Sequence, residues 1–275
     1  MIGLYSYSSN NIGDDIQSLV LRRWLNYREN EVVFVDRDRH TITGTCDENI
    51  TLLINGFIGG GALPVYSGGG FEIDPVFVAV HLYVIDKDPG KLEQLTRAAP
   101  VGCRDLITRR RCIERGIPAY FSACPTILCE PADVKQDIDI LLVDVDPRSL
   151  PKLPERSIRY STNMISPAIP FHKRREMCLR RWELLSRSRL VVTSKLHAAM
   201  PALGMGKPVV FVKEKIIAPE RLSAFPKNFR LYKKGEGFSW DPETHYCDTS
   251  AHRRLVESRL LKQLGRYRKH QFGAN

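Results

Sequence analysis

Short apolar runs recur along the chain, and most of them are followed by a stretch with apolar residues at helical spacing. Runs of about four to eight residues rich in Val, Ile and Leu are typical of strands buried in a parallel sheet. They predict strands over residues 2–7, 31–35, 51–55, 76–80, 119–122, 138–143, 157–160, 190–193, 209–212 and 229–232. The amphipathic stretches predict helices from about residue 16 onward and over 92–97, 106–115, 171–186 and 248–269. This alternation predicts an α/β fold.

A domain boundary is predicted at segment 130–136, which is short, polar and carries a proline. The strand and helix pattern starts again after it, so we expect two Rossmann-like α/β domains, residues 1–130 and 137–275, that meet at a cleft. The C-terminal helix places apolar residues along one side and is expected to pack by that side and to reach back across the cleft. These residues are Leu255, Val256, Leu260, Leu261 and Leu264.

Composition fits a globular protein. The chain has 275 residues, 43% of them hydrophobic, and its longest apolar runs, such as 76–85, are too short to span a membrane. Residues 1–11 lack the basic start and the hydrophobic centre of a secretory leader, so we expect a cytoplasmic protein. The seven cysteines form neither a CxxC pair nor a zinc-like spacing, which indicates a reducing compartment and no metal site.

The formal net charge of +10 predicts an anionic partner. Arginines gather in 104–115, 173–189 and 253–269, for which a solvated helix face is the default explanation. The last two faces also suit a peripheral contact with acidic lipids at the inner face of the membrane. No interleaving of aromatic and basic residues accompanies them, so we do not expect a nucleic acid partner.

The stretch 188–212 carries the strongest candidate chemistry. Ser194, Lys195 and His197 lie in the turn between an apolar strand and a helix, at the sheet edge where open α/β sheets bind ligands. Pro201 has no N–H for the carbonyl of His197, so that oxygen is left free. An ordinary helix start, with Ser194 as its cap, is the alternative.

Polar residues and glycines also follow the strands of the first half. We expect Asp105 to cap a helix, which places Arg104 at the ligand-facing edge and in one cleft with His197. The glycine-rich stretch 56–70 suits backbone packed close to a ligand or a surface loop, and it matches no phosphate-binding motif. The candidates for acceptor or cleft contacts are Asn11, Asp14, Asn55, Gly56 and His81.

Four segments together resemble the polysaccharide pyruvyl transferase family. They are NNIGDDIQ at 10–17, VGCRDLIT at 101–108, GIPAYFSACPTI at 116–127 and VVTSKLHAAMPALGMGKPVVF at 191–211. The resemblance implies a glycosyltransferase-B-like fold that moves pyruvyl from phosphoenolpyruvate onto a sugar of a glycan or a lipid-linked precursor. It implies that His197 is catalytic and that Arg104, Lys195 and Ser194 bind the donor. Family members usually have arginine at the position of Lys195, and a lysine grips an anion less directionally.

The chemistry suits these residue types. Forming a pyruvate ketal requires protonation of the enol carbon and attack by two sugar hydroxyls, and a histidine can transfer those protons. Cationic groups would offset the charges of the donor, and the scheme requires neither a metal nor a cofactor. A nucleotide-sugar glycosyltransferase of the same fold and a non-catalytic basic binding protein remain alternatives.

Overall fold

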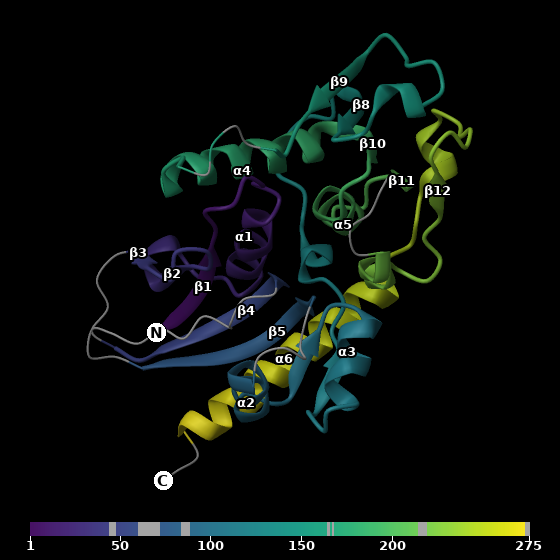
Figure 1. The fold of residues 1–275 in the computed structure, drawn as a ribbon. Helices are drawn as coiled ribbons and strands as arrows, with labels where there is room; N and C mark the ends of the chain where they lie inside the picture. Colours follow the sequence, from purple (N-terminus) through teal and green to yellow (C-terminus); the bar gives the residue numbers. More distant parts are fainter. Residues whose placement is uncertain are drawn as a thin grey trace.

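The computed structural model describes residues 1–43, 48–59, 72–83, 89–163, 166, 168–213 and 219–272. Two sheets lie at opposite ends of the molecule with helices between and around them (Figure 1). The strands are β1 Ile2–Ser6, β2 Val32–Asp36, β3 Ile42–Thr43, β4 Ile50–Ile58, β5 Ile73–Leu82, β6 Val101–Cys103, β7 Ala119–Phe121, β8 Ile138–Val143, β9 Ser157–Tyr160, β10 Ser188–Thr193, β11 Val209–Lys213 and β12 Leu231–Lys233. The helices are α1 Asp15–Trp24, α2 Pro89–Arg97, α3 Leu106–Ile113, α4 Phe171–Arg187, α5 Leu196–Gly204 and α6 Ser250–Phe272.

The first sheet has the order β3-β2-β1-β4-β5-β6-β7. Its strands pair in parallel except β3, which pairs antiparallel with β2 and which the sequence pattern did not predict. At two residues, β3 is too short to show a hydrophobic period. Because the other strands are parallel, their carboxyl ends lie at one edge of the sheet.

The second sheet has the order β12-β11-β10-β8-β9, and every pair in it is parallel. It is separate from the first sheet, as the predicted two-sheet architecture requires. The polar segment 130–136 lies in the connection between β7 and β8. The same connection contains a buried 3-10 helix, Pro125–Leu128, which packs against α1, α5 and α6.

One hydrophobic cluster joins the two halves. It includes Leu4 of β1, Ile127 of the connection, Trp182 of α4, Met200 of α5 and Phe211 of β11. Two smaller clusters each contain strand residues of one sheet, with Phe77 of β5 in one and Val192 of β10 in the other. The helices between the sheets therefore form a shared core, which fixes the two halves relative to each other.

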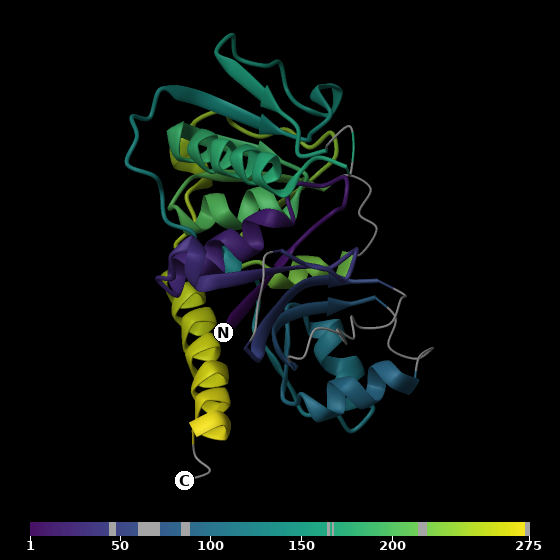
Figure 2. The same cartoon turned by 90° about the vertical axis from the view of Figure 1, so that its left-hand side faces the viewer.

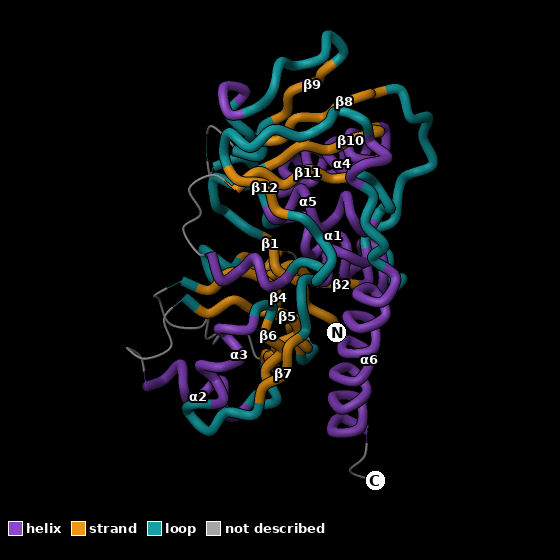
Figure 3. Tube along the Cα trace, turned by 90° about the vertical axis from the view of Figure 1, so that its right-hand side faces the viewer, coloured by secondary structure: helices purple, strands orange, loops and turns teal. Residues whose placement is uncertain are grey.

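Helix α6 leaves the second half and runs alongside the first (Figures 2 and 3). Its Gln263 Nε2 donates a 2.9 Å hydrogen bond to the carbonyl of Pro100, and Val256 and Leu260 are buried. Leu261 was expected on the packed side, but it is 57% exposed. Within the described ranges, no helix is both apolar enough and long enough to span a membrane.

The expectation that the basic clusters are solvated faces is wrong for several arginines. Arg174 and Arg181 of α4 are 2% and 1% exposed. Arg253 of α6 donates to the carbonyls of Ile127, Cys129 and Gly204. Helical periodicity counts an arginine as polar, but its long side chain can be buried when carbonyls or carboxylates accept its hydrogens.

Candidate active site

The structure brings Arg104 and His197 together from opposite halves of the chain. Arg104 follows β6 directly, and its backbone N–H bonds the carbonyl of Val80 at 2.8 Å. His197 lies in the first turn of α5, and its Nε2 is 3.2 Å from Arg104 Nη1. The two side chains are 0% and 4% exposed. Their predicted convergence is thus confirmed, while their roles stay predictions.

The third member of this cluster is Asp14, which precedes α1. Its Oδ1 lies 3.3 Å from His197 Nδ1. A carboxylate only accepts and a guanidinium only donates, so the neutral imidazole carries its proton on Nδ1 and turns the lone pair of Nε2 toward Arg104. The order Asp14, His197, Arg104 is therefore a hydrogen-bonded chain across the interface between the halves.

Burial and charge set the protonation of this chain. Burial lowers the pKa of His197 to about 4; the Arg104 charge acts in the same direction, and the hydrogen bond to Asp14 opposes both. Burial by itself would raise the pKa of Asp14, but the hydrogen bond with His197 and the charges of His197, Arg37 and Arg221 bring it down to about 2. At neutral pH the site thus holds a neutral imidazole beside an ionised carboxylate.

Several guanidinium hydrogens at this site have no acceptor among the described residues. Arg104 Nη1 donates to Gln17 Oε1 at 2.9 Å, but Nε and Nη2 of Arg104 are buried without a partner. The same holds for Nε and Nη1 of Arg181 and for Nε of Arg221. A buried cation with unused donors is costly unless an anion completes it. The cluster is therefore suited to an anionic ligand.

Arg181 is held by the carbonyl that Pro201 leaves free. The sequence predicted an unbonded oxygen at His197, and Arg181 Nη2 donates a hydrogen bond to it. A Cβ atom at Gly13 would lie 3.1 Å from Arg181 Nη1 and 2.7 Å from Asn11 Oδ1. A side chain at position 13 would therefore have to displace the ends of the Asn11 and Arg181 side chains.

The other residues predicted to bind the donor are placed differently. The hydroxyl of Ser194 donates a hydrogen bond to the carbonyl of Asp144, so its proton is not available to a ligand in this arrangement. The half-buried Lys195 side chain forms no hydrogen bond or ion pair with a residue that the structure describes. Neither side chain forms a hydrogen bond or ion pair with Arg104 or His197, so their role in donor binding remains a prediction.

Two of the residues expected as acceptor or cleft contacts, Asn11 and His81, form hydrogen bonds within the fold. Asn11 Oδ1 accepts from the N–H of Gly13 at 2.8 Å, which makes it part of the loop structure. Fully buried His81 is bound through Nδ1 to Asp105 Oδ2 at 2.7 Å. Asp105 also caps α3 by accepting from the N–H of Thr108, as predicted. These contacts hold the His81 ring inside the fold, and its role as an acceptor or cleft contact stays a prediction.

Asn55 and Gly56 are neighbours near the end of β4, and Gly56 lies close to Gln17. Both amide atoms of Asn55 are buried without a partner among the described residues, and its carbonyl accepts from the Tyr7 hydroxyl at 3.1 Å. Gly56 has φ +136°, and a Cβ there would be 3.8 Å from Gln17 Nε2. Of the glycine-rich stretch 56–70, residues 56–59 are described and residues 60–70 lie outside the described residues.

Sequence reasoning missed Gln17, Arg37, Arg181 and Arg221. Arg37 directly follows β2 and lies 3.8 Å from Asp14, so the strand-end argument that selected Arg104 could have found it. Gln17 belongs to the motif at 10–17, one turn after Asp14. Arg221 comes from the 3-10 helix Pro219–Ala224, where no sequence pattern points to the site. In the described part of the chain no group of His, Cys, Asp and Glu side chains could hold a metal ion.

Comparisons with known proteins add little to this geometry. No protein-family model and no curated protein matches the chain. Among solved structures, an uncharacterised protein from Klebsiella pneumoniae is similar at 16% identity with a TM-score of 0.42, over 86% of this chain and 93% of that one. A likeness of this strength carries no functional argument, so the function has to be argued from the site.

Proposed function

We propose that this protein transfers pyruvyl from phosphoenolpyruvate to a sugar of a polysaccharide or its precursor, with its two halves in a glycosyltransferase-B-like arrangement. The observation that carries the proposal is the chain Asp14, His197 and Arg104 beside buried guanidinium groups without acceptors. It combines a proton-transfer group with a place for an anion. The segments that resemble pyruvyl transferases contain all three residues.

The donor would occupy the unpaired guanidinium hydrogens. Phosphoenolpyruvate is compact and has two anionic ends, a carboxylate and a phosphate. Arg104 and Arg221 are close enough for each to lower the pKa of nearby His197, so both lie within electrostatic range of its ring. Planar guanidinium groups bind such oxygens with paired hydrogen bonds. Lys195, half-buried and unpaired among the described residues, adds a cation that could turn to the donor.

His197 would transfer the protons. Burial is the main cause of the low pKa of His197, and the Arg104 charge adds to it; a donor anion on Arg104 would offset that charge and so favour the imidazolium. The imidazolium gives its proton to the methylene carbon, which becomes the methyl group, while the first sugar hydroxyl adds to the neighbouring carbon. Neutral His197 then accepts the proton of this first hydroxyl. Phosphate leaves with its bridging oxygen as the second hydroxyl closes the ketal, and the proton of the second hydroxyl passes to the departing phosphate. Asp14 holds the ring and stabilises its charged form.

The donor cannot reach these side chains without a local rearrangement, because Arg104 and His197 are almost completely buried. Local loop movements of this kind commonly admit substrates to buried sites. The sugar would enter from the same edge and be glycan-bound or lipid-linked. A nucleotide-sugar glycosyltransferase is the alternative with the same architecture, and its diphosphate would also use a cationic site.

Transfer of labelled pyruvyl tests the proposal. Wild-type protein with ¹³C-labelled phosphoenolpyruvate and a panel of glycan acceptors should release phosphate and give a ketal methyl signal in NMR. His197→Gln should abolish transfer while donor binding is largely kept, because it removes proton transfer and not the cations. His172→Gln is the matched control, since His172 is exposed on α4. Transfer that survives His197→Gln would contradict the assigned role.

A further inference from the structure

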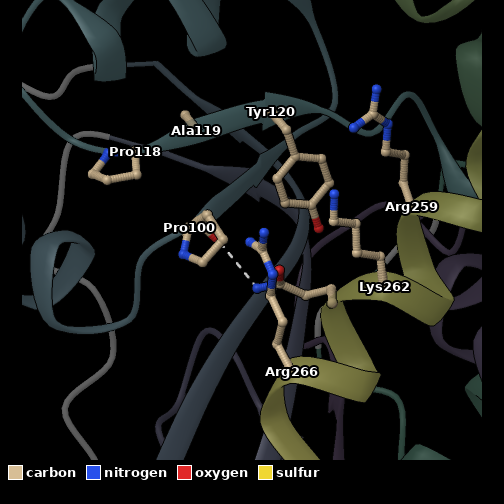
Figure 4. Close-up of a pocket in the computed structure, with 8 residues that line it drawn as sticks. Pro100, Pro118, Ala119, Tyr120, Arg259, Lys262 and Arg266 are labelled. Atoms are coloured by element: carbon tan, nitrogen blue, oxygen red, sulfur yellow. Dashed lines mark hydrogen bonds between the residues drawn. The ribbon is translucent and has the colours of Figure 1, made fainter.

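A cavity of about 200 Å³ lies between α6 and the first sheet, away from the His197 cluster. Figure 4 shows cationic side chains of α6 on one side and residues at the starts of β6 and β7 on the other. Its lining residues are Pro100, Pro118, Ala119 and Tyr120 from the sheet, with Arg259, Lys262, Gln263 and Arg266 from α6. Pro100 and Pro118 each precede the first residue of a strand, whereas Arg104 follows the last residue of β6. The cavity is therefore at the opposite sheet edge from the candidate active site.

The cations of this cavity are not neutralised. Arg259, Lys262 and Arg266 lie on successive turns of α6 and form no ion pair with a residue in the described ranges. The guanidinium carbon of Arg259 is 6.0 Å from the centre of the Tyr120 ring, which keeps this side chain over the cavity. On the same helix, the Arg253 side chain donates hydrogen bonds to backbone carbonyls. Three of the cations of α6 thus face one cavity.

Tyr120 supplies a neutral donor to the same space. Its hydroxyl oxygen is buried without a hydrogen-bond partner among the described residues, and in Figure 4 it points toward the α6 side of the cavity. Burial raises the pKa of Tyr120, although the charges of Arg259 and Arg266 oppose this, so the hydroxyl keeps its proton. A buried hydroxyl without a partner costs free energy that a bound acceptor would recover.

We propose that this cavity binds the phosphate group of a phosphate monoester, with Arg259, Lys262 and Arg266 as cationic partners and the Tyr120 hydroxyl as a hydrogen-bond donor. Three cations and one hydroxyl match a dianion that offers several acceptor oxygens. The volume is below the roughly 300–1,000 Å³ of pockets for larger ligands, which favours a phosphate group over a whole nucleotide. The proposal does not depend on the transfer reaction. The phosphate could belong to a soluble ester or to a lipid headgroup.

Titration with glycerol 3-phosphate, followed by calorimetry, tests the soluble source, and sedimentation with phosphatidic acid vesicles tests the lipid source. We expect one of these probes to bind, and Lys262→Gln with Arg266→Gln to weaken that probe at least about tenfold. Tyr120→Phe, which removes only the hydroxyl, should weaken it about threefold or more. Arg254→Gln is the matched control, because Arg254 is exposed on α6 and does not line the cavity.

The outcomes separate the two sources and the general effect of charge. Loss of glycerol 3-phosphate binding in the cavity variants assigns a soluble ester. Loss of vesicle binding alone, relative to neutral phosphatidylcholine vesicles, assigns a lipid headgroup. If neither probe binds, or if Arg254→Gln weakens binding as much as Lys262→Gln with Arg266→Gln, the cavity is not a phosphate site and the proposal is overturned.

Discussion

The substitution Arg104→Met should leave the free protein about as stable as the wild type while it removes donor binding. A guanidinium has five N–H donors, and two of them, on Nη1, reach Gln17 Oε1 at 2.9 Å and His197 Nε2 at 3.2 Å. The three donors on Nε and Nη2 have no acceptor among the described residues. Arg104 is therefore poorly satisfied in the free protein.

The expected change in stability follows from these contacts. Methionine leaves two acceptors unpaired, at about 1–3 kcal/mol each, but it also removes three unpaired donors and a buried charge of similar or larger cost. The net change should be within about 2 kcal/mol, less than the about 3–5 kcal/mol for breaking a completed buried ion pair. Loss of two charge-assisted hydrogen bonds to the donor should weaken phosphoenolpyruvate about 100-fold or more.

Urea denaturation and calorimetric titration measure the two quantities. Arg110→Met, on exposed Arg110 of α3, makes the same change in charge at the surface and is the control. A loss of more than about 3 kcal/mol of stability with unchanged affinity for phosphoenolpyruvate would make Arg104 a structural residue and refute the reasoning.

Further predictions concern stability. Gly56→Ala should lower the free energy of unfolding by about 1–3 kcal/mol, because alanine is strained at φ +136° and its Cβ would be 3.2 Å from the Tyr7 hydroxyl. Gly237→Ala is the control and should be neutral in the same denaturation assay, because nothing lies within 4 Å of a Cβ there. Arg174→Met should lower the free energy of unfolding by about 3–5 kcal/mol, because it removes a 2.6 Å ion pair and leaves Asp15 buried without its partner. Arg180→Met, at an exposed position of the same helix, is the control, and an equal effect of the two substitutions would contradict the prediction. The pKa of His197 is about 4 in the folded protein and 6.5 is its ordinary value, so the unfolded chain binds more protons between these pH values. The free energy of unfolding should therefore rise from pH 4 to 6.5 by up to about 3 kcal/mol more in wild type than in His197→Gln. Parallel pH curves of the two proteins would disprove this.

Local periodicity predicted the strands, and the positions of strand ends predicted which residues meet at the site. The bounds of β8 and β9 are those expected, and the strand-end argument found Arg104 and His197 although 93 positions separate them. This worked because parallel strands place their carboxyl ends at one edge, so residues distant in sequence share a surface.

What the sequence could not predict depends on long-range packing. The apolar stripe of α4 correctly predicted that Trp182 and Leu185 are buried. Arg174 and Arg181 are buried on the same helix because the loop before α1, Asp15 and His197 supply hydrogen-bond acceptors. Arg221 reaches the site from a 3-10 helix without any period. The shared core between the sheets likewise arises from contacts that neither half specifies by itself.

Calorimetric titration of the wild-type protein with phosphoenolpyruvate and with uridine diphosphate tests the central claim most directly. The unpaired guanidinium hydrogens of Arg104, Arg181 and Arg221 are expected to take a compact donor with a carboxylate and a phosphate. Phosphoenolpyruvate should therefore bind at a site that Arg104→Met removes, and uridine diphosphate should bind there more weakly or not at all. Tight binding of uridine diphosphate with no heat from phosphoenolpyruvate would contradict the account and favour a nucleotide-sugar glycosyltransferase.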